Sequence, residues 1–312
     1  MKFFKKKWNL ATYLLPDEQA AFNAKILESG SSDCVSVHPC IPADTNGSSP
    51  RSDETLVTSR KSSQVLKPFT EIINAHLRGQ RIVDVAQLLK EIQGRVNVGT
   101  ADTSTFLSGS TYQSPAIRLY FYLKTLLEPF FAVSLILFLS PLLLGLALAI
   151  YVTSGRPILY HQERLGYRGK KFPLLKFRTM PMTAEPSGPQ WASEDDPRAT
   201  RLGGWLRKTR MDELPQLLNV LRGELSFVGP RPEREEFYHL LSEKIPLFTM
   251  RLLVRPGITG WAQVKSGYAA SVEESKTKLE YDLYYIQSMS PLMDFQVTLE
   301  TAALVMRGNS GR

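Results

Sequence analysis

The stretch Pro129–Gly155, PFFAVSLILFLSPLLLGLALAIYVTSG, contains 27 consecutive residues without a charged side chain and is almost entirely apolar. A helix needs only about 20 such residues to cross the hydrocarbon core of a bilayer. The segment therefore predicts that the chain is embedded in a membrane. Ser140-Pro141 stands at its middle, and a proline inside a helix removes a backbone hydrogen bond and kinks the helix.

Basic residues flank the apolar segment on both sides. Arg118 and Lys124 precede it, and Arg156 follows it with four more basic residues by position 171. This distribution conflicts with a single crossing under the positive-inside rule. A helix that breaks at Ser140-Pro141 and returns to the same membrane face satisfies both flanks, so we expect a re-entrant hairpin. A kinked single span is the alternative.

Composition and charge limit the class of protein. The 312 residues include 38 Lys plus Arg, 30 Asp plus Glu, two Cys and four His, with a net charge of +8. Two Cys exclude a disulfide framework, and no His/Cys cluster has the spacing of a zinc site. Residues 156–231 contain 14 basic and 8 acidic side chains, an excess of 14 − 8 = +6. Such a block indicates an anionic partner: phosphates, nucleic acid or lipid headgroups.

The sequence after the apolar segment predicts a mixed α/β domain that is mainly helical. Asp212 is expected as the N-cap of one helix, and Leu279, Leu283 and Ile286 as the buried face of another. The predicted elements are strands at 158–161 and 172–177 and helices at 203–210, 212–222, 233–243, 272–289 and 293–306.

The adjacent pair Asp212-Glu213 is the strongest candidate for chemistry, because Arg207 and Arg210 lie within two turns of it. Two neighbouring carboxylates repel unless a cation neutralises them. Mg²⁺ suits this pair, since it binds one or two carboxylates and completes its shell with water and substrate phosphates. The alternative is an ordinary capping Asp followed by a first-turn Glu.

Three further basic residues are candidates for phosphate binding: Lys176 and Arg178 in KFRTM, and Arg231 in VGPRP. The prolines on both sides of Arg231 restrict the backbone and can present its guanidinium at a fixed angle. A surface loop is the alternative for Arg231. In RPGITGWAQV, at 255–264, the glycines permit close backbone approach, and Trp261 suits either a lipid interface or a structural turn.

The N-terminal third is different in composition, rich in Ser, Pro and Asp over 29–65. Such a segment buries too little apolar surface to offset the conformational entropy lost on ordering. We therefore predict a mostly disordered extension over 1–67. Helical periodicity returns afterwards and predicts a small helical subdomain. The expected organisation is an extension at 1–67, a helical subdomain at 68–115, a membrane helix at 116–155 and a catalytic domain at 156–312.

Four motifs together resemble the bacterial sugar transferase family, the monotopic phosphoglycosyl transferases. They are YHQERLGYRGKKFPLLKFRTM at 160–180, WASEDDPRATRLGGWLRKTRMDELPQLLNVLRGELSFVGPRPE at 191–233, RPGITGWAQV at 255–264 and KLEYDLYYIQSMS at 278–290. The resemblance covers about Lys124 to Arg312. In addition, residues 78–108 of this chain are similar to the stretch that precedes the catalytic part in long members of the family. It implies a re-entrant helix broken at a Ser-Pro pair, and a cytosolic catalytic domain with amphipathic interface helices.

The resemblance also implies the reaction and the residue roles. Asp212 would attack the β-phosphate of a UDP-sugar and release UMP, and polyprenyl (undecaprenyl) phosphate would then take the sugar phosphate from the aspartate. Glu213 would bind Mg²⁺. The other roles would be phosphate binding by Arg207, nucleotide contact by Arg231, and active-site support by Lys176 and Arg178. Arg210, close to the pair, is expected to bind substrate together with these four residues. The family commonly has Lys-Arg and an Asp at the start of the membrane helix, where this chain has Lys124, Thr125 and Glu128.

The expected partners are a UDP-sugar, a polyprenyl phosphate and the bacterial inner membrane, with the catalytic domain on the cytoplasmic face. The sugar is undetermined, and a homo-oligomer or contact with downstream glycosyltransferases of surface-glycan assembly stays open. A catalytically silent, membrane-anchored scaffold is the alternative function. Nucleic acid is not expected as a partner, because carboxylates and prolines interrupt the basic block instead of stacking aromatics.

Overall fold

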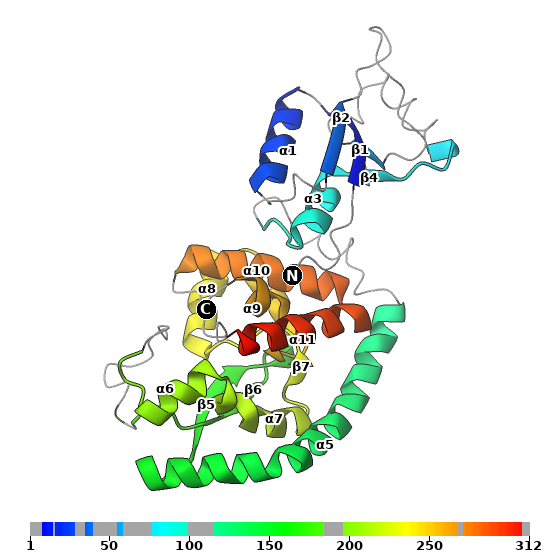
Figure 1. The fold of residues 1–312 in the computed structure, drawn as a ribbon. Coiled ribbons are helices and arrows are strands. Elements are labelled where there is room, and N and C mark those ends of the chain that lie inside the picture. The colour runs from blue at the N-terminus through cyan, green and yellow to red at the C-terminus, as the bar shows by residue number, and fades with distance from the viewer. Residues whose placement is uncertain are drawn as a thin grey trace. The chain divides into compact units, whose positions relative to one another are not determined.

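A computed structural model describes residues 8–14, 16–28, 35–39, 55–58, 76–98, 115–181, 183, 196–266 and 271–307. The chain divides into two compact units, Met1–Arg95 and Val96–Arg312, and each is described by itself. Helices dominate, with short strands in both units (Figure 1), so the expected mixed α/β, mainly helical class is confirmed.

The N-terminal unit contains a parallel sheet of four strands in the order β2-β1-β3-β4. Parallel neighbours need long connections, and two helices occur between or after these strands. Side chains of the sheet and both helices share one apolar core that includes Leu10, Phe22, Val57 and Leu88. The elements are β1 (Trp8–Tyr13), α1 (Pro16–Glu28), β2 (Val35–Pro39), β3 (Thr55–Thr58), β4 (Ile82–Asp84) and α3 (Val85–Gln93).

This sheet differs from the mostly disordered extension that the sequence predicts over 1–67. Strands β1, β2 and β3 and helix α1 all lie within that range. Their pairing is the physical reason: each strand is only four to six residues long, and its partner lies far away in the sequence. The rest of 1–67 and the expected boundary at 67/68 lie outside the described residues.

Helix α5 (Pro115–Ser154) contains the apolar segment and is 40 residues long. Its length and composition suffice to cross a membrane. Pro141 lacks the N–H that would bond the carbonyl of Leu137, and the hydroxyl of Ser140 donates to that same carbonyl at 2.8 Å. Figure 1 shows α5 as a bent helix whose two arms run in different directions. Pro141 thus removes one hydrogen bond from the helix, and the hydroxyl of Ser140 satisfies the carbonyl that is left without its partner.

After α5, the C-terminal unit continues with an antiparallel hairpin of β5 (Leu159–Leu165) and β6 (Lys171–Phe177), joined through the short 3-10 helix η4 (Tyr167–Gly169). Both strands occur where the sequence predicts them, although each is longer. A second, parallel pair consists of β7 (Ser226–Val228) and β8 (Gly257–Thr259).

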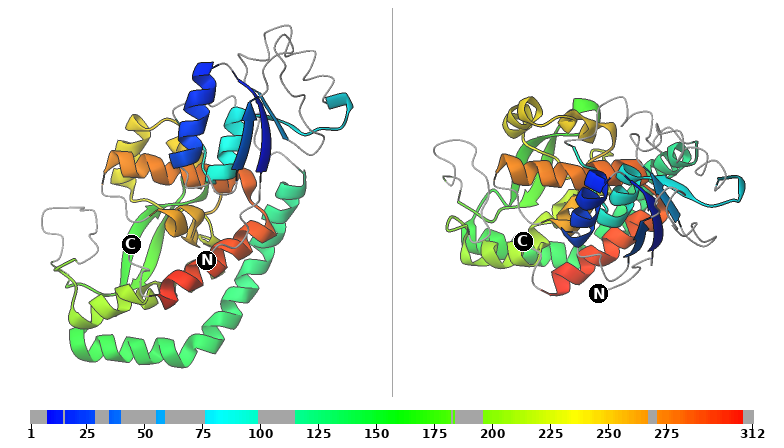
Figure 2. Two further views of the ribbon diagram at one scale, coloured as in Figure 1. Left: turned by 45° about the horizontal axis from the view of Figure 1, so that its top comes forward. Right: turned by 90° about the horizontal axis from the view of Figure 1, so that it is seen from above.

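Helices surround these two pairs of strands (Figure 2). The predicted helix over 212–222 is instead a 3-10 helix followed by one short α-helix, and Asp212 is not its N-cap, because Arg210 occupies that position. The helices are α6 (Arg201–Lys208), η5 (Met211–Gln216), α7 (Leu217–Leu221), α8 (Glu235–Lys244), η6 (Phe248–Leu253), α9 (Trp261–Lys265), α10 (Val272–Ser288) and α11 (Pro291–Met306).

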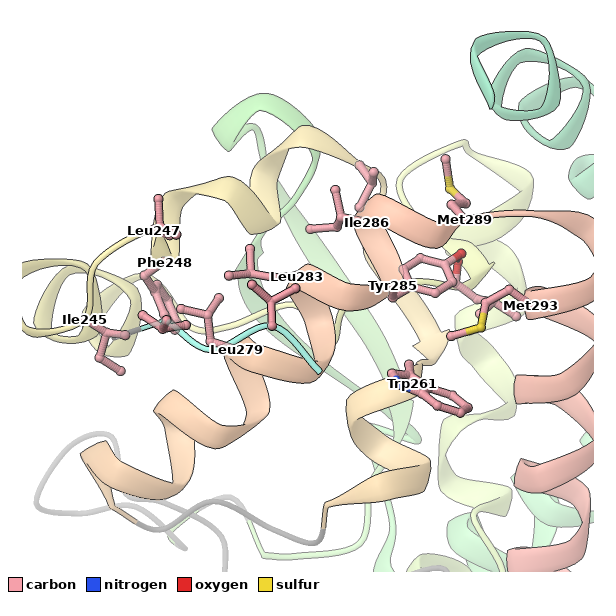
Figure 3. Packing of buried hydrophobic residues seen from close by; sticks show 14 of the residues in the cluster. Ile245, Leu247, Phe248, Trp261, Leu279, Leu283, Tyr285, Ile286, Met289 and Met293 are labelled. Carbon is pink, nitrogen blue, oxygen red and sulfur yellow. The ribbon is translucent and has the colours of Figure 1, made fainter. Parts of the chain in front are cut away.

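The main core of this unit surrounds α10. Leu279, Leu283 and Ile286 are fully buried, which confirms the face that the sequence predicts. Figure 3 shows these side chains among residues of η6, α9 and α11. Trp261 also lies in this core, 6% exposed and stacked on Tyr284, so the lipid-interface reading of that residue is wrong.

The glycines of RPGITG permit close backbone contact, as expected. A Cβ atom on Gly257 would lie 2.1 Å from the backbone nitrogen of Gly229, and one on Gly260 would lie 2.2 Å from the carbonyl oxygen of Gly229. Only glycine fits where two backbones approach so closely. The chain after β7, which includes Arg231, is therefore pressed against the chain around β8.

Candidate active site

Asp212 and Glu213 lie in η5, directly after a sharp turn of the backbone. Arg210, the residue before η5, has φ of 58°, in the left-handed region that residues other than glycine rarely adopt. The turn points both carboxylates into the protein, and each residue is less than 10% exposed. Local strain of this kind is typical of functional sites.

Three cations from different parts of the chain surround one oxygen of Glu213. Its Oε1 lies 2.7 Å from Arg231 Nη2, 3.0 Å from Lys176 Nζ and 3.5 Å from Arg210 Nη1. Burial would raise the pKa of Glu213, but the three cations outweigh burial and hold this pKa well below its ordinary value. Glu213 is therefore ionised and fixed in place.

Asp212 has a different environment although it is the next residue. Its Oδ1 is buried and has no hydrogen-bond partner among the described residues. Burial raises the pKa of Asp212 to about 6; Glu213 adds to this rise, whereas Lys176 and the two arginines oppose it. A buried carboxylate oxygen without a partner is available to a substrate, and such separation of two neighbouring pKa values is typical of reactive carboxyl pairs.

Arg207 lies on α6, next to a carboxylate that the sequence analysis did not single out. Its Nη1 is 3.8 Å from Oδ2 of Asp196, and Asp196 also binds Arg198. The side chain of Asp196 is only 1% exposed. The sequence Asp196-Pro197-Arg198 could have indicated this carboxylate, since Asp before Pro is common at the start of a turn.

The predicted substrate-binding role of Arg178 is not supported by its contacts. Its guanidinium donates to the carbonyls of Ser154, Gly155 and Arg156, at the C-terminal end of α5. A cation at that end satisfies helix carbonyls that lack an intrahelical partner. Arg178, the residue directly after β6, therefore joins the end of α5 to that strand, whereas Lys176 within β6 reaches Glu213.

A cavity of about 400 Å³ lies beside the acidic pair. Glu213 and Arg210 are at its polar part, together with Lys265 of α9. Its apolar wall includes Leu135 and Leu139 of α5 and further leucine and valine side chains of η5, α7, α9 and α11. The cavity therefore connects Glu213 to the surface of the apolar helix.

In its N-terminal half, α5 is anchored by Lys124 and Glu128, at the positions where the resemblance implies Lys-Arg and an Asp. Lys124 donates to the carbonyl of Val228 at 2.7 Å, and Glu128 accepts from Ser226 Oγ and from the backbone N–H of Phe227. Helix α5 is thus bonded to β7, the strand that leads to Arg231. Glu128 makes these contacts where the resemblance implies the shorter Asp.

Curated proteins similar to this chain are named for one type of reaction. The chain is 37% identical to the UDP-N-acetylgalactosamine-undecaprenyl-phosphate N-acetylgalactosaminephosphotransferase of Aeromonas hydrophila. The aligned region of 231 residues covers 74% of this chain and 53% of the relative. It is 35% identical over 192 residues to the UDP-glucose:undecaprenyl-phosphate glucose-1-phosphate transferase of Escherichia coli (strain K12), covering 61% and 41%. The chain thus spans about half or less of the length of these two relatives.

A shorter relative has the same type of name. The UDP-glucose:undecaprenyl-phosphate glucose-1-phosphate transferase of Caulobacter vibrioides is 41% identical over 180 residues, covering 57% of this chain and 67% of the relative. The sequence model of bacterial sugar transferases matches residues 119–308, which include most of α5, the acidic pair and the three cations that surround Glu213. This chain belongs to the bacterial sugar transferase family.

Proposed function

We propose that this protein transfers a sugar 1-phosphate from a UDP-sugar to undecaprenyl phosphate and releases UMP. The observation that supports this most is the acidic pair: Asp212 has a buried oxygen without a described partner, and Glu213 beside it is surrounded by three cations. The names of the relatives supply the substrate class, and they differ in the sugar, which is glucose or N-acetylgalactosamine.

The reaction proceeds in two displacements at the β-phosphorus. In the first, a carboxylate oxygen of Asp212 forms a bond to this phosphorus, and the bond from phosphorus to the oxygen bridging to the α-phosphate breaks. UMP departs with that oxygen, and the sugar phosphate stays on Asp212. In the second, a phosphate oxygen of undecaprenyl phosphate attacks the same phosphorus and releases Asp212. A covalent intermediate divides one difficult transfer into two easier steps.

The cations around Glu213 suit the charge of these steps. Arg210, Arg231 and Lys176 lie on three separate elements and converge on one point, so they can bind phosphoryl oxygens from different sides. Fixed positive groups in a site with little water stabilise charge that develops during transfer. Arginine adds a planar fork that matches phosphate oxygens.

Mg²⁺ is the proposed cofactor, with Glu213 as its protein ligand. The described residues contain no group of three His, Cys, Asp or Glu that could hold a metal by themselves. Two adjacent carboxylates, one with an unpartnered oxygen, still fit Mg²⁺, which takes one or two carboxylates and fills its shell with water and substrate phosphates. When bound, the ion would neutralise charge on the diphosphate.

The cavity beside the pair suits a lipid acceptor. Its polar part contains Arg210 and Lys265, which can attract a phosphate, and Leu135 and Leu139 of α5 form part of its apolar wall. A polyprenyl phosphate has the same division into an anionic head and an apolar chain. The position of the cavity would allow the lipid phosphate to reach Asp212 from the membrane helix.

The proposed membrane arrangement is a re-entrant hairpin of α5 with the catalytic domain on the cytoplasmic face of the bacterial inner membrane. The basic flanks and the bond from Ser140 to Leu137 support a break within the membrane. Helix α11 exposes Leu292, Phe295 and Leu299 along one face, which suits a helix at the lipid interface. Figure 2 also shows the start of α11 beside the first arm of α5.

The test is transfer by purified protein in nanodiscs that contain undecaprenyl phosphate. The enzyme is incubated with Mg²⁺ and a panel of UDP-sugars, and the released nucleotide is identified. The wild type and Glu243→Gln, which changes an exposed carboxylate, should release UMP, whereas Asp212→Asn should not. EDTA should abolish release, and added Mg²⁺ should restore it.

Other outcomes would contradict the proposal in specific ways. Release of UDP would indicate direct glycosyl transfer without the aspartyl intermediate. Absence of any release from the whole donor panel would favour the scaffold. Omitting the lipid should leave a sugar phosphate on the wild-type peptide that contains Asp212, and mass spectrometry of that peptide tests the intermediate directly.

A further inference from the structure

The turn Pro230–Pro232 is held in place through its carbonyl groups. Prolines have no backbone N–H, so this turn has few donors of its own. The carbonyl of its first proline accepts from Gly257 N at 2.9 Å, that of Arg231 from Arg251 Nη2 at 2.8 Å, and that of its last proline from Arg164 Nη1 at 3.1 Å. Donors from three separate elements therefore fix three consecutive carbonyls.

Arg251 has a special position among the three donors. It bonds the backbone of Arg231, and the side chain of Arg231 in turn lies 2.7 Å from Glu213 Oε1. A shift of this carbonyl would move the guanidinium relative to the acidic pair. Arg251 itself makes no described contact with Asp212 or Glu213, so its influence must pass through Arg231.

Arg251 is held as firmly as the turn that it supports. Its Nε donates to Asp282 Oδ2 of α10 at 2.9 Å, and Nη1 lies 3.5 Å from Glu233 Oε1. The guanidinium also lies over the ring of Phe248, 5.0 Å from its centroid. The side chains of Arg251 and Asp282 are 8% and 2% exposed.

Buried ion pairs contribute little to stability compared with apolar residues of similar volume. The pair of Arg251 and Asp282 has a different advantage, because Arg251 uses a further donor to bond the carbonyl of Arg231. This bond fixes the position of the turn relative to the acidic pair. The Nε–H and Nη–H groups of one planar guanidinium point in defined directions. One arginine can therefore bond Asp282 and the carbonyl of Arg231 at the same time.

We propose that Arg251, anchored by Asp282, is a positioning residue that holds the turn Pro230–Pro232 and thereby sets the guanidinium of Arg231 against Glu213. The catalytic consequence rests on the proposed function. The structural consequence, a turn that becomes loose when Arg251 is changed, does not depend on it.

The first experiment is a double-mutant cycle in the UMP-release assay. Arg251→Lys retains the charge but cannot span Asp282 and the carbonyl, so kcat/KM should fall roughly ten- to hundredfold. Because the effect passes through Arg231, Arg251→Lys should cause little further loss in an Arg231→Ala background. Losses that multiply in the double variant would overturn the proposal.

Control variants separate positioning from general destabilisation. Leu283→Val changes a fully buried neighbour of Asp282 on α10 that donates no hydrogen bond to the turn, and its kcat/KM should match the wild type. Asp282→Asn is the second test variant, since it removes the charge that anchors Arg251 and keeps the shape. An Asp282→Asn protein with wild-type kcat/KM would contradict the proposal.

Hydrogen exchange of the peptide spanning 226–237 gives a readout that needs no turnover. Arg251→Lys and Asp282→Asn should accelerate exchange there by about tenfold or more, and Leu283→Val should not. If the wild type releases no UMP with any donor, the proposed function fails while exchange still tests the turn. Unchanged exchange in both variants would overturn the positioning role even in an active enzyme.

Discussion

Lys124 Nζ lies 2.5 Å from Asp294 Oδ2, and this ion pair joins the beginning of the apolar helix α5 to the first turn of α11. The hydroxyls of Tyr120 and Tyr285 donate to the same carboxylate, at 2.6 and 2.7 Å. Lys124 also bonds the carbonyl of Val228. One largely buried polar cluster thus connects α5, the strand before the Arg231 turn and α11.

Lys124→Met should destabilise the C-terminal unit, because it leaves Asp294 buried without its cation. Loss of one partner of a buried pair typically costs about 3 to 5 kcal/mol. Thermal and denaturant unfolding in detergent should reveal this loss, while Lys170→Met, at an exposed position, should have wild-type stability. Replacing Lys124 and Asp294 together by Met and Leu should recover part of the loss; an equally unstable double variant would contradict this explanation.

Asp212→Asn should abolish UMP release and yet stabilise the protein. Burial raises the pKa of Asp212 to about 6 in the folded state, above its ordinary 3.8, so the ionised form destabilises the fold at neutral pH. The folded wild type binds this proton more tightly than the unfolded chain, and its stability from this group falls as the pH rises from 3.8 to about 6. The variant should be more stable by about 1 to 3 kcal/mol above pH 6.

The pH dependence distinguishes this explanation from better packing by asparagine. Relative to the wild type, the stability gain of Asp212→Asn should be complete at pH 8 and shrink as the pH falls below about 6 toward 4. Thermal unfolding in EDTA at several pH values measures the difference without a bound divalent ion. A gain that is the same at pH 8 and pH 4 would indicate packing instead of charge.

Two adjacent glycines of α6 should respond in opposite ways to alanine. A Cβ on Gly203 would lie 2.1 Å from the carbonyl oxygen of Thr179, whereas a Cβ on Gly204 has nothing within 4 Å. Gly203→Ala should cost roughly 1 to 3 kcal/mol through overpacking and should lower activity by displacing Arg207 on the same helix. Gly204→Ala should stabilise the protein by about 0.5 to 1 kcal/mol.

Differential scanning fluorimetry and the UMP-release assay compare the two variants under identical conditions. The identical substitution at neighbouring positions of one helix makes Gly204→Ala a matched control. Equal changes in melting temperature would show that α6 is not pressed against Thr179 as the structure has it.

The re-entrant hairpin makes a prediction about sidedness. Single cysteines at Ala116 and Lys170, both exposed, should react with a membrane-impermeant maleimide from the same side, in a variant with Ser at positions 34 and 40. Inverted and right-side-out vesicles identify that side, which should be cytoplasmic. Labelling of the two positions from opposite sides would establish a single span and refute the hairpin.

Local patterns in the sequence predict several features that the structure contains. Leu279, Leu283 and Ile286 recur at helical spacing and form the centre of the main core. The β5–β6 hairpin occurs where short apolar runs flank a turn. In each case the decisive interactions lie within one element or one turn, so the residue spacing is sufficient information.

Pairing between distant segments is much less accessible to sequence reasoning. The sequence predicts disorder where the N-terminal sheet lies, because strands such as Thr55–Thr58 are too short to show a pattern and become ordered only by pairing with strands elsewhere in the chain. Asp212 was expected as a helix N-cap, but the left-handed turn at Arg210 begins the 3-10 helix earlier. Neither feature has a local signal as strong as hydrophobic periodicity.

The sequence by itself determined that the chain has a long apolar helix interrupted by Ser140-Pro141, and that an acidic pair lies within a basic block. Only the tertiary structure decided which cations reach that pair. Lys176 and Arg231, 37 and 18 residues from Glu213, contact it, whereas Arg178, two residues after Lys176, binds the end of α5. The reason is that Arg178 lies just beyond the end of β6, beside the carbonyls at the end of α5, and contacts between such distant segments depend on how whole elements pack.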